Sequence, residues 1–115
     1  MTRTPEEVFQ HHAEALVAGD LDGIVDDYTD DAAFITPGGV KLGKDGVREG
    51  FTQLLTDLPN AAWDIKTTIF VGDALFLEWA AVAAATKAED GIDTFIFRDG
   101  QIRLQTVRYT VQHTY

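Results

Sequence analysis

The stretch Ile92-Asp-Thr-Phe-Ile-Phe-Arg-Asp-Gly-Gln-Ile-Arg-Leu-Gln-Thr-Val107 decides the fold class of this chain. Apolar and polar residues alternate on both sides of Asp99-Gly100, a dipeptide that favours a tight hairpin turn. The pattern predicts antiparallel strands over Ile92–Arg98 and Gln101–Gln112. Glu89-Asp90-Gly91 predicts another turn just before this hairpin.

Strand patterns also precede the hairpin. Residues 61–71 alternate, and one face of this expected strand carries Trp63, Ile65, Thr67, Ile69 and Val71. Leu75–Thr86 is almost continuously apolar, interrupted by Glu78, which predicts a strand covered on both faces. A short strand is expected over Ala32–Thr36, ended by Pro37-Gly38-Gly39.

Helical signals occupy the N-terminal half. Thr4–Gly19 begins with a capping box and a proline and ends at a glycine, which predicts a first helix. Asp20 begins a short second helix, and its expected solvated side carries Asp22, Asp26, Asp27, Asp30 and Asp31. Gly43–Leu58 predicts a third helix, in which Gly50 indicates a close approach or an empty space. The order predicts one α+β domain over residues 1–115, with three helices before a four-stranded antiparallel meander.

Composition narrows the function classes. The chain has 115 residues, 19 acidic against 9 basic residues and a net charge of −10, which argues against nucleic acid and anionic membranes as partners. Most of this charge lies in residues 1–60, which carry 12 acids and 4 bases. Cysteine is absent, which leaves the redox compartment open. No apolar run approaches the length of a membrane span, and the first residues lack a basic segment followed by an apolar one, so no signal peptide is visible and we expect a cytoplasmic protein. His11 and His12 are adjacent on a helix and point in different directions, so no metal site is expected.

Several segments resemble the ketosteroid isomerase and SnoaL-like polyketide cyclase group of the nuclear transport factor 2-like superfamily. They are Ala18-Gly-Asp-Leu-Asp-Gly-Ile-Val25, Asp30-Asp31-Ala32, Gly43, Gly46-Val47-Arg48, Ile92-Asp-Thr-Phe-Ile-Phe97 and Asp99-Gly-Gln-Ile102. The resemblance implies a cone-shaped, curved antiparallel sheet wrapped around three N-terminal helices. It also implies a deep apolar pocket, an apolar small-molecule ligand, no cofactor and a homodimer formed through the outer sheet face. A shared fold does not assign an activity, so each site residue is compared separately.

The resemblance carries over only part of the isomerase site. The isomerase base, an aspartate, is replaced by Thr36, and a hydroxyl does not accept a proton at neutral pH without a helper. The oxyanion-binding tyrosine is replaced by His12, whereas the protonated aspartate matches Asp93. SnoaL-like cyclases commonly carry a catalytic aspartate late in the final strand, but no acid follows Asp99 here.

Asp93 and His12 are the candidate catalytic residues. Asp93 alternates in phase with Phe95 and Phe97, and a carboxyl desolvated beside aromatic rings would keep its proton and donate a hydrogen bond to a carbonyl or enolate oxygen. The alternative is an exposed, inert aspartate beside a turn. His12 is either a second donor or acid/base group, or a core histidine. The expected pocket wall comprises Trp63, Trp79, Phe95, Phe34 and Thr36.

Strand register leaves one position open. If Glu78 faces the pocket, it could replace the missing base; if Trp79 does, Glu78 lies outside, where Arg103 or Arg108 could pair with it. We favour Trp79 as the inward residue. Three functions remain: an isomerase- or cyclase-type enzyme acting on an apolar carbonyl compound, a non-catalytic ligand-binding module, and a dimeric interaction protein with a filled pocket.

Overall fold

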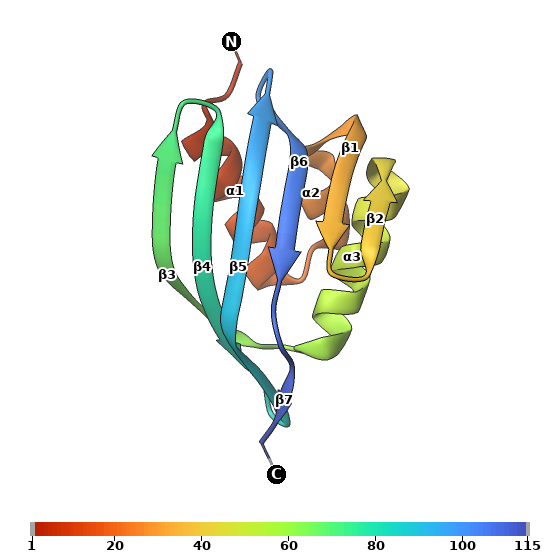
Figure 1. The fold of residues 1–115 in the computed structure, drawn as a ribbon, viewed down its shortest axis with the longest axis vertical. Helices are drawn as coiled ribbons and strands as arrows, with labels where there is room; N and C mark the ends of the chain where they lie inside the picture. Colours follow the sequence, from red (N-terminus) through yellow and green to blue (C-terminus); the bar gives the residue numbers. More distant parts are fainter. Residues whose placement is uncertain (1, 115) are drawn as a thin grey trace.

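Helices and a curved sheet form the computed structural model, which describes residues 2–114 (Figure 1). The helices are α1 (Pro5–Ala18), α2 (Leu21–Asp26) and α3 (Gly43–Asp57). The strands are β1 (Tyr28–Thr36), β2 (Gly39–Leu42), β3 (Ala62–Val71), β4 (Ala74–Val82), β5 (Thr86–Arg98), β6 (Gln101–Arg108) and β7 (Gln112–His113).

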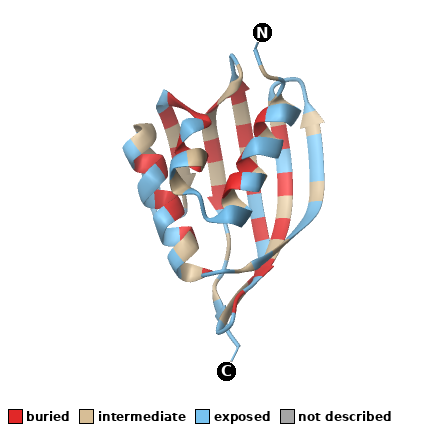
Figure 2. Ribbon diagram, turned by 180° about the vertical axis from the view of Figure 1, so that it is seen from behind, coloured by how far each residue is buried: buried red, intermediate tan, exposed pale blue. Residues whose placement is uncertain are grey.

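The sheet is open and mostly antiparallel, in the order β2-β1-β6-β5-β4-β3, with β7 paired to the start of β5. The pairing of β1 with β6 is parallel. All three helices lie across one face of the sheet, and buried residues concentrate where helices and strands meet (Figure 2). The predicted α+β class, a curved sheet wrapped around N-terminal helices, is confirmed.

The helix ends form as the sequence predicts. Thr4 and Glu7 make a complete capping box at the start of α1, and Gly19 ends this helix with a φ of 68°, which suits glycine. The side chain of Asp20 accepts a hydrogen bond from the Gly23 amide and begins α2. These caps set where α1 begins and ends, and therefore which of its residues face the sheet.

Several predicted strand boundaries are wrong. Glu89-Asp90-Gly91 is not a turn but part of β5: Gly91 pairs with Trp79 and packs against its ring, and the register shifts at Glu89-Asp90, where β5 has one extra residue. The early strand begins at Tyr28, β2 follows it as an extra strand, and the last predicted strand ends at Arg108 before the separate β7. Long-range pairing with β6 extends β1, which a local pattern does not reveal.

Two predictions about strand faces also need correction. A register shift between Ile65 and Thr67 divides β3 into two halves. In the first half, Trp63 and Ile65 lie opposite inward residues of β4. In the second half, Thr67, Ile69 and Val71 lie opposite outward residues of β4. Strand β4 is not covered on both faces: its burial alternates, and its outward residues are partly exposed. The apolar outer face of the sheet explains why β4 looked like a fully buried strand.

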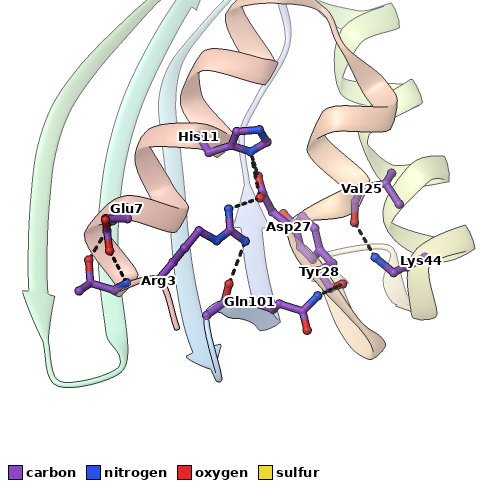
Figure 3. A network of polar contacts seen from close by, with 10 residues as sticks. Arg3, Glu7, His11, Val25, Asp27, Tyr28, Lys44 and Gln101 are labelled. Carbon is purple, nitrogen blue, oxygen red and sulfur yellow. Dashed lines mark hydrogen bonds and ion pairs between the residues drawn. The ribbon is translucent and has the colours of Figure 1, made fainter. Parts of the chain in front are cut away.

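The prediction that Asp27 lies on a solvated helix face is wrong, because its residue surface is only 1% exposed. Arg3 Nη1 donates to its Oδ1 at 2.9 Å, and His11 Nδ1 lies 2.7 Å from its Oδ2 (Figure 3). Arg3 also donates to the Gly100 carbonyl, and the Ile102 amide donates to the Asp27 carbonyl. This network ties α1 to the N-terminal segment and to the β5–β6 hairpin, and so fixes the rotation of the helix that carries His12.

Candidate active site

Asp93 lies at the centre of a buried polar cluster on the inner face of β5. It is 5% exposed, and both of its carboxyl oxygens accept hydrogen bonds. Trp79 Nε1 donates to Oδ1 at 2.9 Å, and Gln105 Nε2 donates to Oδ2 at 2.8 Å. The Tyr28 hydroxyl donates in turn to the amide oxygen of Gln105. Four strands, β1, β4, β5 and β6, therefore supply one connected network.

Burial dominates the titration of Asp93. Desolvation raises the pKa of this carboxyl from 3.8 to about 7, although hydrogen bonds from Trp79 and Gln105 lower it. Both protonation states are therefore populated near neutral pH. A carboxyl with such a pKa can give up or accept a proton with little cost, which is the property required of a general acid or base.

His12 faces the same interior from α1. It is 3% exposed, its ring centroid lies 5.4 Å from those of Phe51 and Phe95, and its Nδ1 has no hydrogen-bond partner. Desolvation lowers the pKa of His12 to about 4, Asp27 raises it and His11 lowers it. The imidazole is therefore neutral at pH 7, so one of its two ring nitrogens carries no proton.

Two adjoining cavities lie between the helices and the sheet, the smaller one against α1 and α3 and the larger one against α3. The inner one has a volume of about 30 Å³, enough for about one water molecule, and both His12 and Asp93 line it. The outer one has a volume of about 350 Å³, within the range of small-molecule sites, and Gln105 lines it. Phe51 and Leu54 line both cavities and divide the space between them.

The predicted wall residues separate into three groups. Trp63 and Trp79 line the inner cavity, and Phe34 and Thr36 line the outer one. Phe95 is fully buried and packs against His12, but it lines neither cavity. Thr36 is thus a cavity residue, although its hydroxyl bonds to the neighbouring turn rather than to any acid or base.

The open register question at β4 has a clear outcome. Trp79 faces inward and is buried, while Glu78 lies on the outer face opposite Ile92. Within residues 2–114, no ion pair joins Glu78 to Arg103 or Arg108. Glu78 is therefore not a replacement for the missing base, and its expected arginine partner is not found in the single chain.

Gln105, Asp57 and Tyr109 are site residues that the sequence analysis missed. Gln105 lies two residues before Val107, on the same inner face of β6. A polar residue at an inward strand position was therefore the signal that could have identified Gln105 as a site residue. Asp57 lies at the end of α3 and Tyr109 follows β6, and the sequence pattern did not predict that these two segments meet. Gly50 was noticed correctly: a Cβ there would lie 2.4 Å from the ring of Phe34, and both residues line the outer cavity.

Among residues 2–114, no group of three or more histidine, cysteine, aspartate or glutamate residues could hold a metal ion. In the same range, no helix combines the length and the apolar character needed to cross a bilayer.

Comparison with known families identifies the domain. Residues 9–105 match the model of the SnoaL-like domain. The chain belongs to the SnoaL-like domain family. No curated protein matches the chain in sequence.

Solved structures show that the fold of this SnoaL-like chain is widespread. An NTF-2 like protein of unknown function from Burkholderia xenovorans is 24% identical, with a TM-score of 0.75, over 92% of this chain and 82% of that one. An NTF2-like protein of unknown function from Cytophaga hutchinsonii is 11% identical, with a TM-score of 0.77, over 96% and 93% of the two chains. IdmH, a candidate polyketide cyclase from Streptomyces antibioticus, is 16% identical, with a TM-score of 0.75, over 93% and 92%. At these identities the likeness shows the fold alone.

Proposed function

We propose that this SnoaL-like protein is a small-molecule enzyme of the isomerase or cyclase type, acting on an apolar carbonyl compound with Asp93 as proton donor. The observation that carries the proposal is a buried carboxyl whose pKa is raised to about 7, lining one cavity together with the neutral imidazole of His12. IdmH, which has the same fold, is a candidate polyketide cyclase, and this is consistent with the proposed substrate class.

We assign substrate binding to the outer cavity and the chemical step to the inner one. The apolar body of the substrate would occupy the outer cavity, lined by Phe34, Leu54 and Val107. Displacement of the Phe51 ring would join this cavity to the inner one, so that the carbonyl end reaches Asp93. Excluding water from such a site strengthens every hydrogen bond to the reacting oxygen.

The proposed step is enolisation. Protonated Asp93 donates its proton to the carbonyl oxygen, while the neutral imidazole of His12 accepts a proton from the adjacent carbon. The electron pair of the broken C–H bond forms the enol C=C bond, and the carbonyl π electrons move to the oxygen. Return of a proton to the same or to a conjugated carbon completes exchange or isomerisation.

A proton-exchange assay tests the activity. We expect the protein to accelerate the exchange of the acidic C–H protons of 2-tetralone for deuterium, followed by NMR. The rate should fall as the pH rises through about 7, because Asp93 then loses the proton that it donates. Asp93→Asn should reduce the rate by about a hundredfold or more, the size of a single acid–base contribution. Asp99→Asn, in the exposed β5–β6 turn, is the matched control and should leave the rate unchanged.

A non-catalytic binding module is the second candidate, favoured by one observation. Both oxygens of Asp93 already accept hydrogen bonds, so the carboxyl also serves to hold Trp79 and Gln105 in place. Tight binding of 2-naphthol, the aromatic counterpart of the 2-tetralone enol, without any exchange of 2-tetralone would favour binding alone. Exchange that Asp93→Asn abolishes would exclude it.

A second copy of this chain is the proposed partner of the outer sheet face. The exposed apolar residues of this face are Ile69, Val71, Phe76, Val82 and Ile92. Glu78, Ile92 and Arg108 form one row across β4, β5 and β6, with the two opposite charges flanking Ile92. A twofold axis through Ile92 and parallel to the strands would place each Glu78 against Arg108 of the other copy.

Charge reversal tests this arrangement. Glu78→Arg and Arg108→Glu should each weaken the dimer in sedimentation equilibrium, because each puts like charges together. The double variant should restore dimerisation. A wild-type protein that stays monomeric, or a double variant no better than the single ones, would contradict the proposed pairing.

A further inference from the structure

The outer cavity is apolar along most of its wall but has polar groups at two places. Six polar or charged side chains line it: Thr36, Lys41, Gln53, Asp57, Gln105 and Tyr109. Thr36 is engaged with the adjacent turn, and Lys41 Nζ pairs with Glu49 at 2.7 Å. The remaining polar groups gather around Gln105 and around Asp57.

Asp57 and Tyr109 form a compact pair at one of these places. The Tyr109 hydroxyl donates to Asp57 Oδ2 at 2.7 Å, and Gln53 Nε2 donates to Oδ1 at 2.8 Å. Thr86 Oγ1 donates to the main-chain oxygen of Asp57 at 2.6 Å and anchors the end of α3. Burial and Asp57 raise the pKa of Tyr109, so its phenol keeps its proton and remains a donor.

The two polar groups occupy neighbouring places on the cavity wall. Asp93 pairs with Val107, midway between Gln105 and Tyr109, and the Tyr109 ring lies 5.6 Å from that of Trp79, which donates to Asp93. Phe34, Leu54 and Val107 contribute the apolar wall of the same cavity. A ligand that fills this space therefore contacts aromatic and aliphatic groups and two distinct polar groups.

We propose that the cavity takes an apolar compound that carries two oxygens, and that Asp57 accepts a hydrogen bond from the second of these, a hydroxyl. The proposal rests on the proposed function, in which the carbonyl or enol oxygen lies beside Gln105 and Asp93. Each carboxylate oxygen of Asp57 accepts one protein donor and has a further lone pair for a ligand hydroxyl. Such charge-assisted hydrogen bonds are stronger than neutral ones, so Asp57 would select substrates that carry this hydroxyl.

A matched pair of ligands tests the inference. 4-Phenylphenol and 4,4′-dihydroxybiphenyl differ by one hydroxyl at the far end, and isothermal titration calorimetry measures both dissociation constants. We expect the diol to bind at least about tenfold more tightly to the wild-type protein. Asp57→Leu should abolish this advantage, and Asp57→Asn, which keeps the shape of the side chain, should reduce it severalfold. Asp64→Leu, at an exposed aspartate of β3, is the control and should preserve it.

Each outcome decides between the two proposals. Equal binding of both compounds, or an advantage of the diol that survives Asp57→Leu, would overturn the role of Asp57 and leave the proposed function intact. Failure of the wild-type protein to bind either compound would count against the ligand pocket itself, and so against both proposals. Thermal unfolding of each variant shows whether a lost advantage reflects a lost fold.

Discussion

Replacing Asp93 by asparagine should change how the stability of the fold depends on pH. The folded state raises the pKa of this carboxyl from 3.8 to about 7, so folding favours its protonated form. The stabilisation is fully present below about pH 4 and is lost as the pH rises through about 7. The difference between the two pKa values corresponds to about 4 kcal/mol of unfolding free energy.

Urea unfolding of both proteins between pH 4 and pH 8, at constant ionic strength, measures this contribution. The free energy of unfolding of the wild type, minus that of Asp93→Asn, should fall by about 4 kcal/mol across the range. The effect of His12 is common to both proteins and cancels in this difference. The asparagine oxygen can accept from Trp79, and rotation of the Gln105 amide restores its partner, so the variant should fold. A difference independent of pH would refute the assignment of a raised pKa to Asp93.

Other substitutions test the remaining parts of the site. In the wild type, the free energy of unfolding should fall by about 3 kcal/mol as the pH falls from 6.5 through 4, because burial keeps the His12 imidazole neutral. His12→Leu should abolish this fall, which urea unfolding at pH 4 and pH 7 measures. Trp79→Phe removes a hydrogen bond that lowers the pKa of Asp93, so ¹³C NMR of the carboxyl should show a pKa above 7, and an unchanged value would contradict this role. Gly50→Ala should cost about 1–3 kcal/mol and weaken 2-naphthol binding, because its Cβ meets the ring of Phe34; wild-type behaviour in both assays would mean that the cavity wall yields freely.

Local patterns predicted the helices well because their signals are local. A capping box at Thr4 and a left-handed glycine at Gly19 act within a few residues, and both formed as expected. Alternation placed Asp93 on one face with Phe95 and Phe97 but left open which face is inward, and the family resemblance indicated the pocket side that the structure shows. The family resemblance added the three-dimensional arrangement of these elements, which alternation does not contain.

The errors came from contacts between distant segments. Asp27 looked like one more acid on a solvated helix face, but Arg3 and His11 pair with it in the interior. The bulge in β3 reversed the faces of its second half, because one extra residue exchanges inward and outward side chains. Asp57 and Tyr109 meet only because the end of α3 lies beside the end of β6. None of these pairings has a signal in local sequence.

A ¹³C NMR titration of the Asp93 carboxyl, with and without 2-naphthol, tests directly whether Asp93 is the proton donor of the pocket. We expect a pKa of about 7 in the free protein. We expect a higher pKa of Asp93 in the complex, because the protonated carboxyl donates a hydrogen bond to the ligand oxygen. Ligand binding therefore favours the protonated form of Asp93. A pKa near 4 in the free protein, or one that 2-naphthol leaves unchanged or lowers, would contradict the role of Asp93 as the proton donor of this pocket.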